Sequence, residues 1–168
     1  YLTYRPDDPR IAQVIAHEVA HQWWYGVVGN DVFNEPWLDE ALVQYASVLY
    51  LEEVEGKEAA EQRLQAYEEK RRRLRDLERY DPPVNSPVWA FAPPEFEHYF
   101  DIVYDKGALF LDALRREIGD AAFFQGLRTY YERYRFGVAT AEGFLDAMQQ
   151  AAGRDLRAFF EAWVGDLK

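Results

Sequence analysis

The chain has 168 residues, 49% of them hydrophobic, which is enough for one globular domain with a substantial core. Its formal net charge of -11 repels phosphate backbones and anionic headgroups, so neither nucleic acid nor an acidic membrane is expected as a partner. Because the chain has no cysteine, it has no disulfides and no thiolate metal ligands, and any metal ion would be held by nitrogen and oxygen atoms.

The first residues do not form a signal-peptide pattern, and no uncharged apolar run reaches the roughly 18 residues of a membrane-spanning helix. We therefore expect a soluble protein, whose compartment the sequence does not indicate. The chain starts without Met and reaches its chemical motif at residue 17. We expect residues 1–168 to be a single helical catalytic subdomain excised from a longer polypeptide.

Two helices are predicted in the first third of the chain. The first covers residues 8–25 and begins with Asp-Pro, a favoured pair of N-cap and first helical residue. Residues 11–28 hold a single charged side chain, Glu18, so we expect this helix to be buried. The second helix covers residues 37–53 and is stopped by Gly56.

A charged third helix is predicted over residues 57–79. Its apolar residues recur at spacings of three, four and seven, which is typical of a helix on the surface of a domain. The basic run at 70–75 stands among glutamates on neighbouring turns, which favours an ion-paired, solvated face over a nucleic-acid patch. The apolar positions are Ala60, Leu64, Tyr67, Leu74 and Leu77.

Residues 80–99 contain five prolines, which exclude regular secondary structure. The segment also holds Trp89, Phe91 and Phe96, so it is too apolar for a free linker. We expect one long, ordered Pro-rich loop that packs on the domain.

The rest of the chain is predicted to form four helices. Two cover residues 101–118 and 120–134, a third is capped by Thr140 and ended by Gly153, and the last is capped by Asp155. No stretch of convincing length alternates polar and apolar residues with a period of two, so no strand is predicted. The expected fold class is therefore all-α.

The first helix contains the sequence HEVAH, from His17 to His21. Residues four apart on a helix lie about 40° apart around the axis and about 6 Å apart along it, so both imidazoles project from one face and can bind one ion. Glu18 lies beside this pair, where its carboxylate can reach a water molecule on the metal. The alternative for so short a motif is chance occurrence, with the histidines hydrogen-bonded in a core.

A third ligand follows in the first turn of the second helix. Glu40 comes after His21 with eighteen residues between them. Two histidines, a glutamate and a water molecule form the open arrangement of a catalytic zinc, so we predict one Zn2+ per chain on His17, His21 and Glu40. The alternative for Glu40 is a solvated carboxylate favoured by the helix dipole. Gln44, one turn later, is a candidate partner for a zinc-bound imidazole.

These motifs resemble the aminopeptidase N family of zinc metallopeptidases, which are gluzincins. The likeness rests on HEVAHQWW at 17–24, WLDEALVQY at 37–45 and Tyr-Asp-Lys-Gly at 104–107, and it extends through the helical tail at 109–163. It implies the helical subdomain of a zincin-type, thermolysin-like catalytic domain. It also implies that Tyr104 stabilises an oxyanion, whereas the sequence by itself also allows a core tyrosine there.

The chain departs from the family pattern at two points. Where the family has Trp-Leu-Asn-Glu-Gly, this chain has Asp39 and Ala41, which leaves the glutamate ligand in place. The family's Gly-x-Met-Glu-Asn motif, which binds a substrate's free amino terminus from a β-rich subdomain before HExxH, is not in this sequence. We therefore expect missing N-terminal β-rich subdomains of the same parent chain as partners.

The expected function is zinc-dependent hydrolysis of a peptide substrate by a metal-activated water, most closely that of an aminopeptidase. Glu18 would be the general base and Tyr104 the oxyanion donor. Phe96 and Tyr99 precede Tyr104 closely and are candidates for lining the cleft. A metal-binding but inactive scaffold and a thermolysin-like zinc endopeptidase are the alternatives, and the Tyr-x-Lys-Gly motif favours the aminopeptidase.

Overall fold

The structure, a computed structural model, describes residues 11–93 and 95–167. The all-α prediction is confirmed, because most of these residues are helical. No helix within these ranges is both long enough and apolar enough to cross a membrane. The α-helices described are α1 (Ile11–Ala20), α2 (Trp37–Val54), α3 (Lys57–Arg73), α4 (Gly107–Ile118), α5 (Asp120–Tyr134), α6 (Ala141–Ala152) and α7 (Arg157–Val164).

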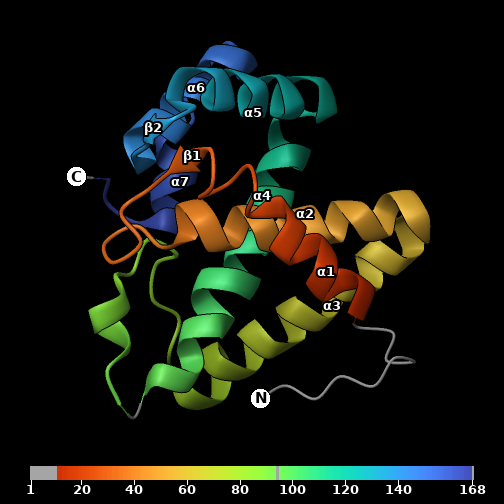
Figure 1. The fold of residues 1–168 in the computed structure, drawn as a ribbon. Coiled ribbons are helices and arrows are strands. Elements are labelled where there is room, and N and C mark those ends of the chain that lie inside the picture. Colours follow the sequence, from red (N-terminus) through yellow and green to blue (C-terminus); the bar gives the residue numbers. More distant parts are fainter. Residues whose placement is uncertain (1–10, 94, 168) are drawn as a thin grey trace.

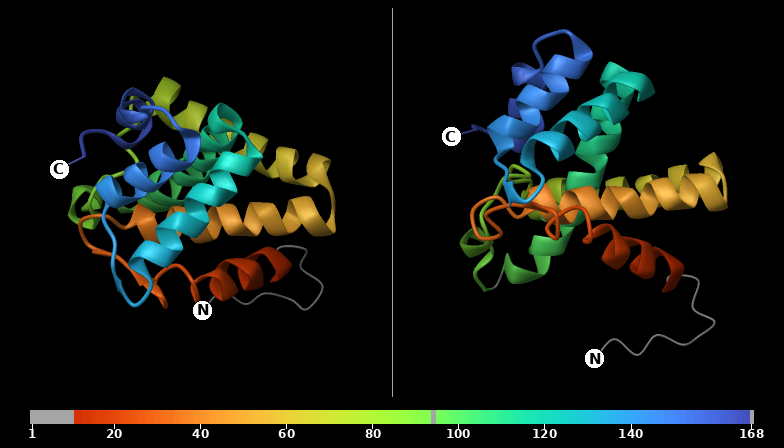
Figure 2. Two further views of the ribbon diagram at one scale, coloured as in Figure 1. Left: turned by 90° about the horizontal axis from the view of Figure 1, so that it is seen from above. Right: turned by 45° about the horizontal axis from the view of Figure 1, so that its top comes forward.

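Helix α2 lies at the centre of the fold (Figure 1). Helices α1, α3 and α4 each pack against it, and α5 packs along α6. Figure 2 shows α2 and α3 extending side by side. In Figure 1 the pair α5 and α6 lies above α2 and α3 lies below it. Trp37 and Phe110 are fully buried and their rings meet edge to face at 5.7 Å, so the core lies where α2 and α4 cross.

The close approach of α2 and α4 depends on Gly107. A Cβ atom at this position would lie 2.4 Å from Cβ of Ala41, far inside van der Waals contact. Glycine is therefore required here, although it costs roughly 1 kcal/mol of helix propensity. The crossing holds the π-helical segment Phe100–Lys106, which leads into α4, against α2.

The only strands in the described part of the chain form a two-residue ladder. Strand β1 (Val28–Gly29) pairs in parallel with β2 (Gly137–Val138). The N–H of Phe136 also donates to the carbonyl of Val27 at 2.7 Å. The ladder ties the loop after α1 to the loop between α5 and α6. Strands this short have no side-chain alternation, which is why the sequence does not predict them.

The first helix differs from its prediction in length and in burial. Helix α1 ends at Ala20, so His21 lies in the turn that follows, and the predicted helix start lies outside the described residues. The expectation of a buried helix is wrong, since Ile15, Val19 and Trp23 are 56%, 49% and 49% exposed. The reason is that α1 packs one face on α2, while no described element covers its opposite face.

The later helices follow their predicted bounds closely. The hydroxyl of Thr140 accepts the N–H of Gly143 at 3.2 Å at the start of α6, and Gly153 ends that helix in the left-handed conformation. One apolar position of the predicted third helix does not face the domain: Leu77 is 76% exposed. It lies in the π-helical segment Leu74–Glu78, whose wider turn rotates later residues away from the face that α3 buries.

The proline-rich segment is an ordered, packed loop, as predicted. Val84 and Phe91 are buried, at 0% and 1% exposed. The N–H groups of Val84 and Asn85 donate to the carbonyls of Trp163 and Val164 at 3.0 and 3.3 Å. These contacts fix the loop to the end of α7.

A cluster of charges also holds this loop to α3 and to the segment before α4. Asp81 accepts hydrogen bonds from Nζ of Lys106 at 2.7 Å and from Arg71 at 3.0 Å. Lys106 is 4% exposed and also donates to the Pro82 carbonyl at 2.6 Å. Burial alone would raise the pKa of Asp81, but the two cations outweigh it and lower that pKa. Burial lowers the pKa of Lys106.

Replacing Asp81 by Asn is expected to lower the free energy of unfolding at neutral pH by about 2–3 kcal/mol, because Lys106 stays buried without its carboxylate. The folded pKa of Asp81 lies below its unfolded value of 3.8, so the carboxylate stabilises the fold above that value. This stabilisation is lost as the pH falls through the folded pKa. Urea unfolding at a series of pH values should show the two proteins converging in acid.

The matched control for this prediction is Asp146→Asn, since Asp146 is exposed on α6. It should change the free energy of unfolding little at any pH. A difference between wild type and Asp81→Asn that stays constant into acid would contradict the assignment of the effect to the Asp81 carboxylate.

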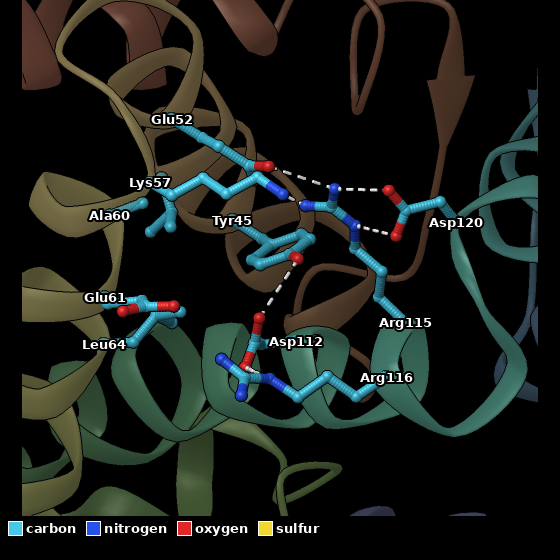
Figure 3. Close-up of a pocket in the computed structure, with 11 residues that line it drawn as sticks. Tyr45, Glu52, Lys57, Ala60, Glu61, Leu64, Asp112, Arg115, Arg116 and Asp120 are labelled. Atoms are coloured by element: carbon cyan, nitrogen blue, oxygen red, sulfur yellow. Dashed lines mark hydrogen bonds and ion pairs between the residues drawn. The ribbon is translucent and has the colours of Figure 1, made fainter.

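A second cluster of charges surrounds a cavity of about 150 Å³ between α2, α3 and α4 (Figure 3). Arg115 pairs with Glu52 at 2.6 Å and with Asp120 at 2.9 Å, and Tyr45 donates to Asp112 at 3.4 Å. The guanidinium therefore joins the end of α2 to α4 and to the start of α5. We interpret this cavity as a structural junction, and none of the predicted site residues lines it.

Candidate metal centre

Helix α1, the turn after it and the first turn of α2 bring the three predicted ligands together. Nε2 of His17 lies 3.5 Å from Oε2 of Glu40, and Nε2 of His21 lies 3.7 Å from the same oxygen. One ligand atom from each residue lies within 4.8 Å of the others. Three such atoms can bind one ion together.

The other ring nitrogens of both histidines contact α2. Nδ1 of His17 lies 3.0 Å from Oε1 of Gln44, and Nδ1 of His21 lies 2.7 Å from Oδ1 of Asp39. These contacts leave both Nε2 atoms facing Glu40, and amide or carboxylate oxygens orient metal-binding histidines in this way. Gln44 is the partner that the sequence suggested. The role of Asp39 was not predicted, and its only signal is a carboxylate directly before the ligand.

The residues present fit a divalent cation. Oε2 of Glu40 is enclosed and has no hydrogen-bond partner within residues 11–93 and 95–167. A buried carboxylate oxygen without a partner is costly, and a cation between it and the two imidazoles would remove that cost. Two imidazole nitrogens and one carboxylate oxygen are also the donor set of catalytic zinc sites, which keep a position open.

The electrostatics of the site favour a cation as well. Asp39 is 6% exposed, and its burial raises its pKa, although the nearby His21 opposes the rise. Burial lowers the pKa of His17, but Glu40 and Gln44 outweigh it, so that pKa is raised. Two neighbouring carboxylates thus share one small, partly desolvated space with two imidazoles, and positive charge there is stabilised.

Glu18 is exposed on α1, contrary to the burial expected for this helix, and it is not among the converging ligands. With His17 and Tyr104 it lines a cavity of about 380 Å³, which lies between α1, α2 and α3. A carboxylate in this position can exchange a proton with a water molecule in the cavity without competing for the ion.

Tyr104 packs against the imidazole of His17. Its ring stacks on His17 with the ring centroids 5.7 Å apart and the planes at 4°. It is half-buried, packs against the edge of the core and also lines the cavity. Burial, followed by the Glu40 carboxylate, raises the pKa of Tyr104, so the phenol stays protonated and can donate a hydrogen bond. The π-helical segment that carries it is a feature that often occurs at functional sites.

Tyr104 also belongs to a cluster of aromatic side chains. Tyr99 and Phe100 lie 5.7 and 5.1 Å from it between ring centroids, and Phe96 stacks on Tyr99 at 6.4 Å. Burial raises the pKa of Tyr99 to about 12. Neither Phe96 nor Tyr99 is among the residues that line the 380 Å³ cavity, so their cleft-lining role stays a prediction.

Gln44 connects His17 to Asp105, the residue that follows Tyr104. Its Nε2 donates to the Tyr67 hydroxyl at 2.9 Å and to Oδ1 of Asp105 at 3.1 Å. Asp105 in turn accepts a hydrogen bond from Nζ of Lys70 at 3.0 Å. Most of the basic run is ion-paired as expected, and Lys70 also reaches the buried Asp105 next to the site, which the sequence did not predict.

Known proteins resemble this chain over most of its length. The sequence matches the Peptidase family M1 domain at residues 3–163. Aminopeptidase N of Lactococcus lactis subsp. lactis is 29% identical over 159 residues, which cover 92% of this chain and 18% of that protein. The mitochondrial aminopeptidase 2 of Saccharomyces cerevisiae is 28% identical over 156 residues, covering 92% of this chain and 16% of that protein.

Solved structures of M1 zinc metallopeptidases also resemble this chain. The M1 zinc metallopeptidase of Deinococcus radiodurans superimposes with a TM-score of 0.71 and 27% identity, covering 93% of this chain and 33% of that chain. Its E323A mutant bound to the substrate Tyr-Ser-Ala gives a TM-score of 0.70 and 27% identity, with 91% and 33% covered. This chain thus spans less than a fifth of the two curated relatives. Because the family domain matches almost all of the chain, the chain belongs to peptidase family M1.

Proposed function

We propose that this chain carries the zinc centre of a metallopeptidase that hydrolyses peptide bonds, most closely an aminopeptidase. The observation that carries the proposal is the convergence of His17, His21 and Glu40 within 4.8 Å, next to a cavity lined by Glu18 and Tyr104. Relatives named aminopeptidase N and neighbours named zinc metallopeptidases support the reaction class. The three converging residues would hold one zinc ion per chain.

A bound zinc ion would polarise the scissile carbonyl and lower the pKa of a water molecule. Glu18, exposed in the cavity, would accept a proton from the attacking water and return it to the leaving amine. Tyr104, which its raised pKa keeps protonated, would donate a hydrogen bond to the oxygen on which negative charge develops. Gln44 and Asp39 would hold the two imidazoles in the orientation that the site needs.

We also propose that further, β-rich subdomains of a parent chain complete the substrate cleft. Two observations support this: the chain spans 18% of the Lactococcus relative, and α1 exposes an apolar stripe. The stripe consists of Ile15 and Val19 on α1 and Trp23 in the turn after it, each four residues from the next. A peptide would then lie between such a subdomain and the cavity.

The function is tested in the natural full-length polypeptide that contains these residues, by measuring its zinc content and its hydrolysis of matched peptides. An aminopeptidase should cleave peptides with a free amino terminus about 10²-fold faster than the same peptides with an acetylated one. Equal rates would identify an endopeptidase instead. About one zinc per chain without hydrolysis of either peptide would identify a metal-binding scaffold.

Replacing Tyr104 by Phe is expected to lower kcat by about 10²–10³-fold, because the hydrogen-bond donor to the developing oxyanion is lost. Zinc content and KM should change little, since Tyr104 is not a ligand. Steady-state kinetics and metal analysis check this, with the exposed Tyr50→Phe of α2 as the control. An unchanged kcat would assign Tyr104 to packing alone.

Replacing Gln44 by Leu is expected to weaken zinc binding by about 10–100-fold, because Nδ1 of His17 loses the oxygen that orients the ring. Competition with a chelating dye measures the affinity. Gln62→Leu, at an exposed position of α3, is the matched control and should bind zinc as the wild type does. Wild-type affinity in the Gln44 variant would show that the contact does not orient the ligand.

A further inference from the structure

The cavity beside the metal centre contains one cationic side chain that the proposed mechanism does not use. This is Arg63 of α3, the only lysine or arginine among the described residues that line the cavity. Glu18 and Asp105 supply its negative charges. Arg63 therefore shares a cavity with Glu18 and Tyr104, the residues proposed as general base and oxyanion donor.

Arg63 has no partner in the described part of the chain. Later on the same helix Lys70, Arg71 and Arg72 all form ion pairs, with Asp105, Asp81 and Glu68 respectively. Arg63, by contrast, forms no ion pair or hydrogen bond with any described residue. It is also half-buried rather than free in solvent. A partly desolvated guanidinium without a partner among residues 11–93 and 95–167 is well suited to bind an anion.

The position of the guanidinium connects it to the metal centre. Arg63 lies one turn before Tyr67, whose hydroxyl accepts a hydrogen bond from Gln44 at 2.9 Å. Gln44 in turn lies 3.0 Å from Nδ1 of His17. Arg63 and Tyr67 also line the same cavity, together with His17. Arg63 is therefore part of the same cavity wall as the residues that contact His17.

We propose that Arg63 binds a carboxylate of the substrate, and that the site prefers peptides with a carboxylate close to the bond that is cleaved. This inference rests on the proposed peptidase function. Arginine pairs with a carboxylate through two parallel hydrogen bonds, which gives orientation as well as affinity. The cavity volume of about 380 Å³ lies in the range of small-ligand sites. The carboxylates of Glu18 and Asp105 repel an anion elsewhere in the cavity, so a substrate carboxylate is favoured only beside Arg63.

The carboxylate has two possible sources, the α-carboxylate that ends a short peptide and an acidic side chain next to the scissile bond. Two pairs of peptides separate them. Leu-Ala is compared with Leu-Ala-amide for the first source, and Leu-Glu-amide with Leu-Gln-amide for the second. In the natural full-length polypeptide, kcat/KM should be about tenfold higher for the acid member of one pair.

Arg63→Met is expected to abolish this discrimination, lowering kcat/KM for the acid member about tenfold more than for its neutral partner. Arg63→Lys keeps the charge and should retain part of the discrimination. The matched control is Arg73→Met, since Arg73 is exposed on the same helix and outside the cavity. It should retain all of the discrimination. Equal acid-to-neutral ratios in wild type and Arg63→Met, in both pairs, would overturn the proposal.

A binding measurement separates failure of this inference from failure of the proposed function. Calorimetry with the zinc-loaded Glu18→Gln protein reports affinity for the same four peptides without turnover. Acid-dependent binding that is lost on adding Arg63→Met, in a protein whose wild type hydrolyses no peptide, would retain the carboxylate site and reject the peptidase. Hydrolysis without any acid preference in rate or affinity would retain the peptidase and reject the carboxylate site.

Discussion

Replacing Glu18 by Gln is expected to lower kcat by about 10²–10⁴-fold while the chain keeps its zinc. Glutamine has the shape of glutamate but cannot accept a proton at neutral pH. Zinc should stay bound because His17, His21 and Glu40 converge without Glu18. Steady-state kinetics on a peptide with a free amino terminus measure kcat, and metal analysis measures the zinc content. Both are compared between Glu18→Gln and the wild type.

The control for this variant is Glu55→Gln, at an exposed position that follows α2 and lies outside the cavity. It should have wild-type kcat and zinc content. If Glu18→Gln kept its metal and lost no turnover, Glu18 would not be the general base. If it lost both, the side chain would act on metal binding, and its catalytic role would have to be withdrawn.

Replacing Glu40 by Ala is expected to remove zinc from the protein. Of the three ligands it is the only anion, and its Oε2 lies 3.5 and 3.7 Å from the Nε2 atoms of His17 and His21. Two imidazoles alone hold zinc weakly, so the affinity should fall by more than the roughly 10–100-fold that loss of an orienting partner costs. Metal content after dialysis should fall from about one zinc per chain to a small fraction of that.

Thermal unfolding gives a second measure of the same loss. A metal that binds only the folded state raises the unfolding temperature, so zinc should stabilise the wild type and leave Glu40→Ala unchanged. Glu53→Ala, an exposed glutamate near the end of α2, is the control and should respond to zinc as the wild type does. One retained zinc per chain in Glu40→Ala would mean that other residues bind the ion.

The prediction of the ligands depended on regularities that are local in the chain. HEVAH repeats histidine at the spacing of one helical turn, and Glu40 follows at the start of the next helix, so each signal lies in one short segment. The structure brings these residues together, although His21 reaches the site from the turn after α1 rather than from the helix. The N–H of Trp24 donates to the carbonyl of Ala20 at 3.1 Å, so the turn continues the winding of the helix past His21.

The side chains around the ligands were harder to predict, because their partners are distant in the sequence. Gln44 contacts Asp105, 61 residues away, and Asp105 contacts Lys70, 35 residues away. No local pattern distinguishes Lys70 from the other cations of its basic run. The same holds for Arg63, whose place in the cavity, without a partner among the described residues, is visible only in the folded chain.

The sequence by itself determined most of the helices, the Thr140 cap and Gly153 end of α6, the absence of thiolate chemistry and the three candidate ligands, because helical periodicity, capping and ligand spacing are properties of short segments. Only the tertiary structure decided the exposure of α1 and the contacts of Asp39 and Gln44 with the histidines. It also decided the close crossing at Gly107 and the cavity that contains Arg63. Burial, ion pairing and cavities depend on which distant segments pack together, and that information is spread over the whole chain.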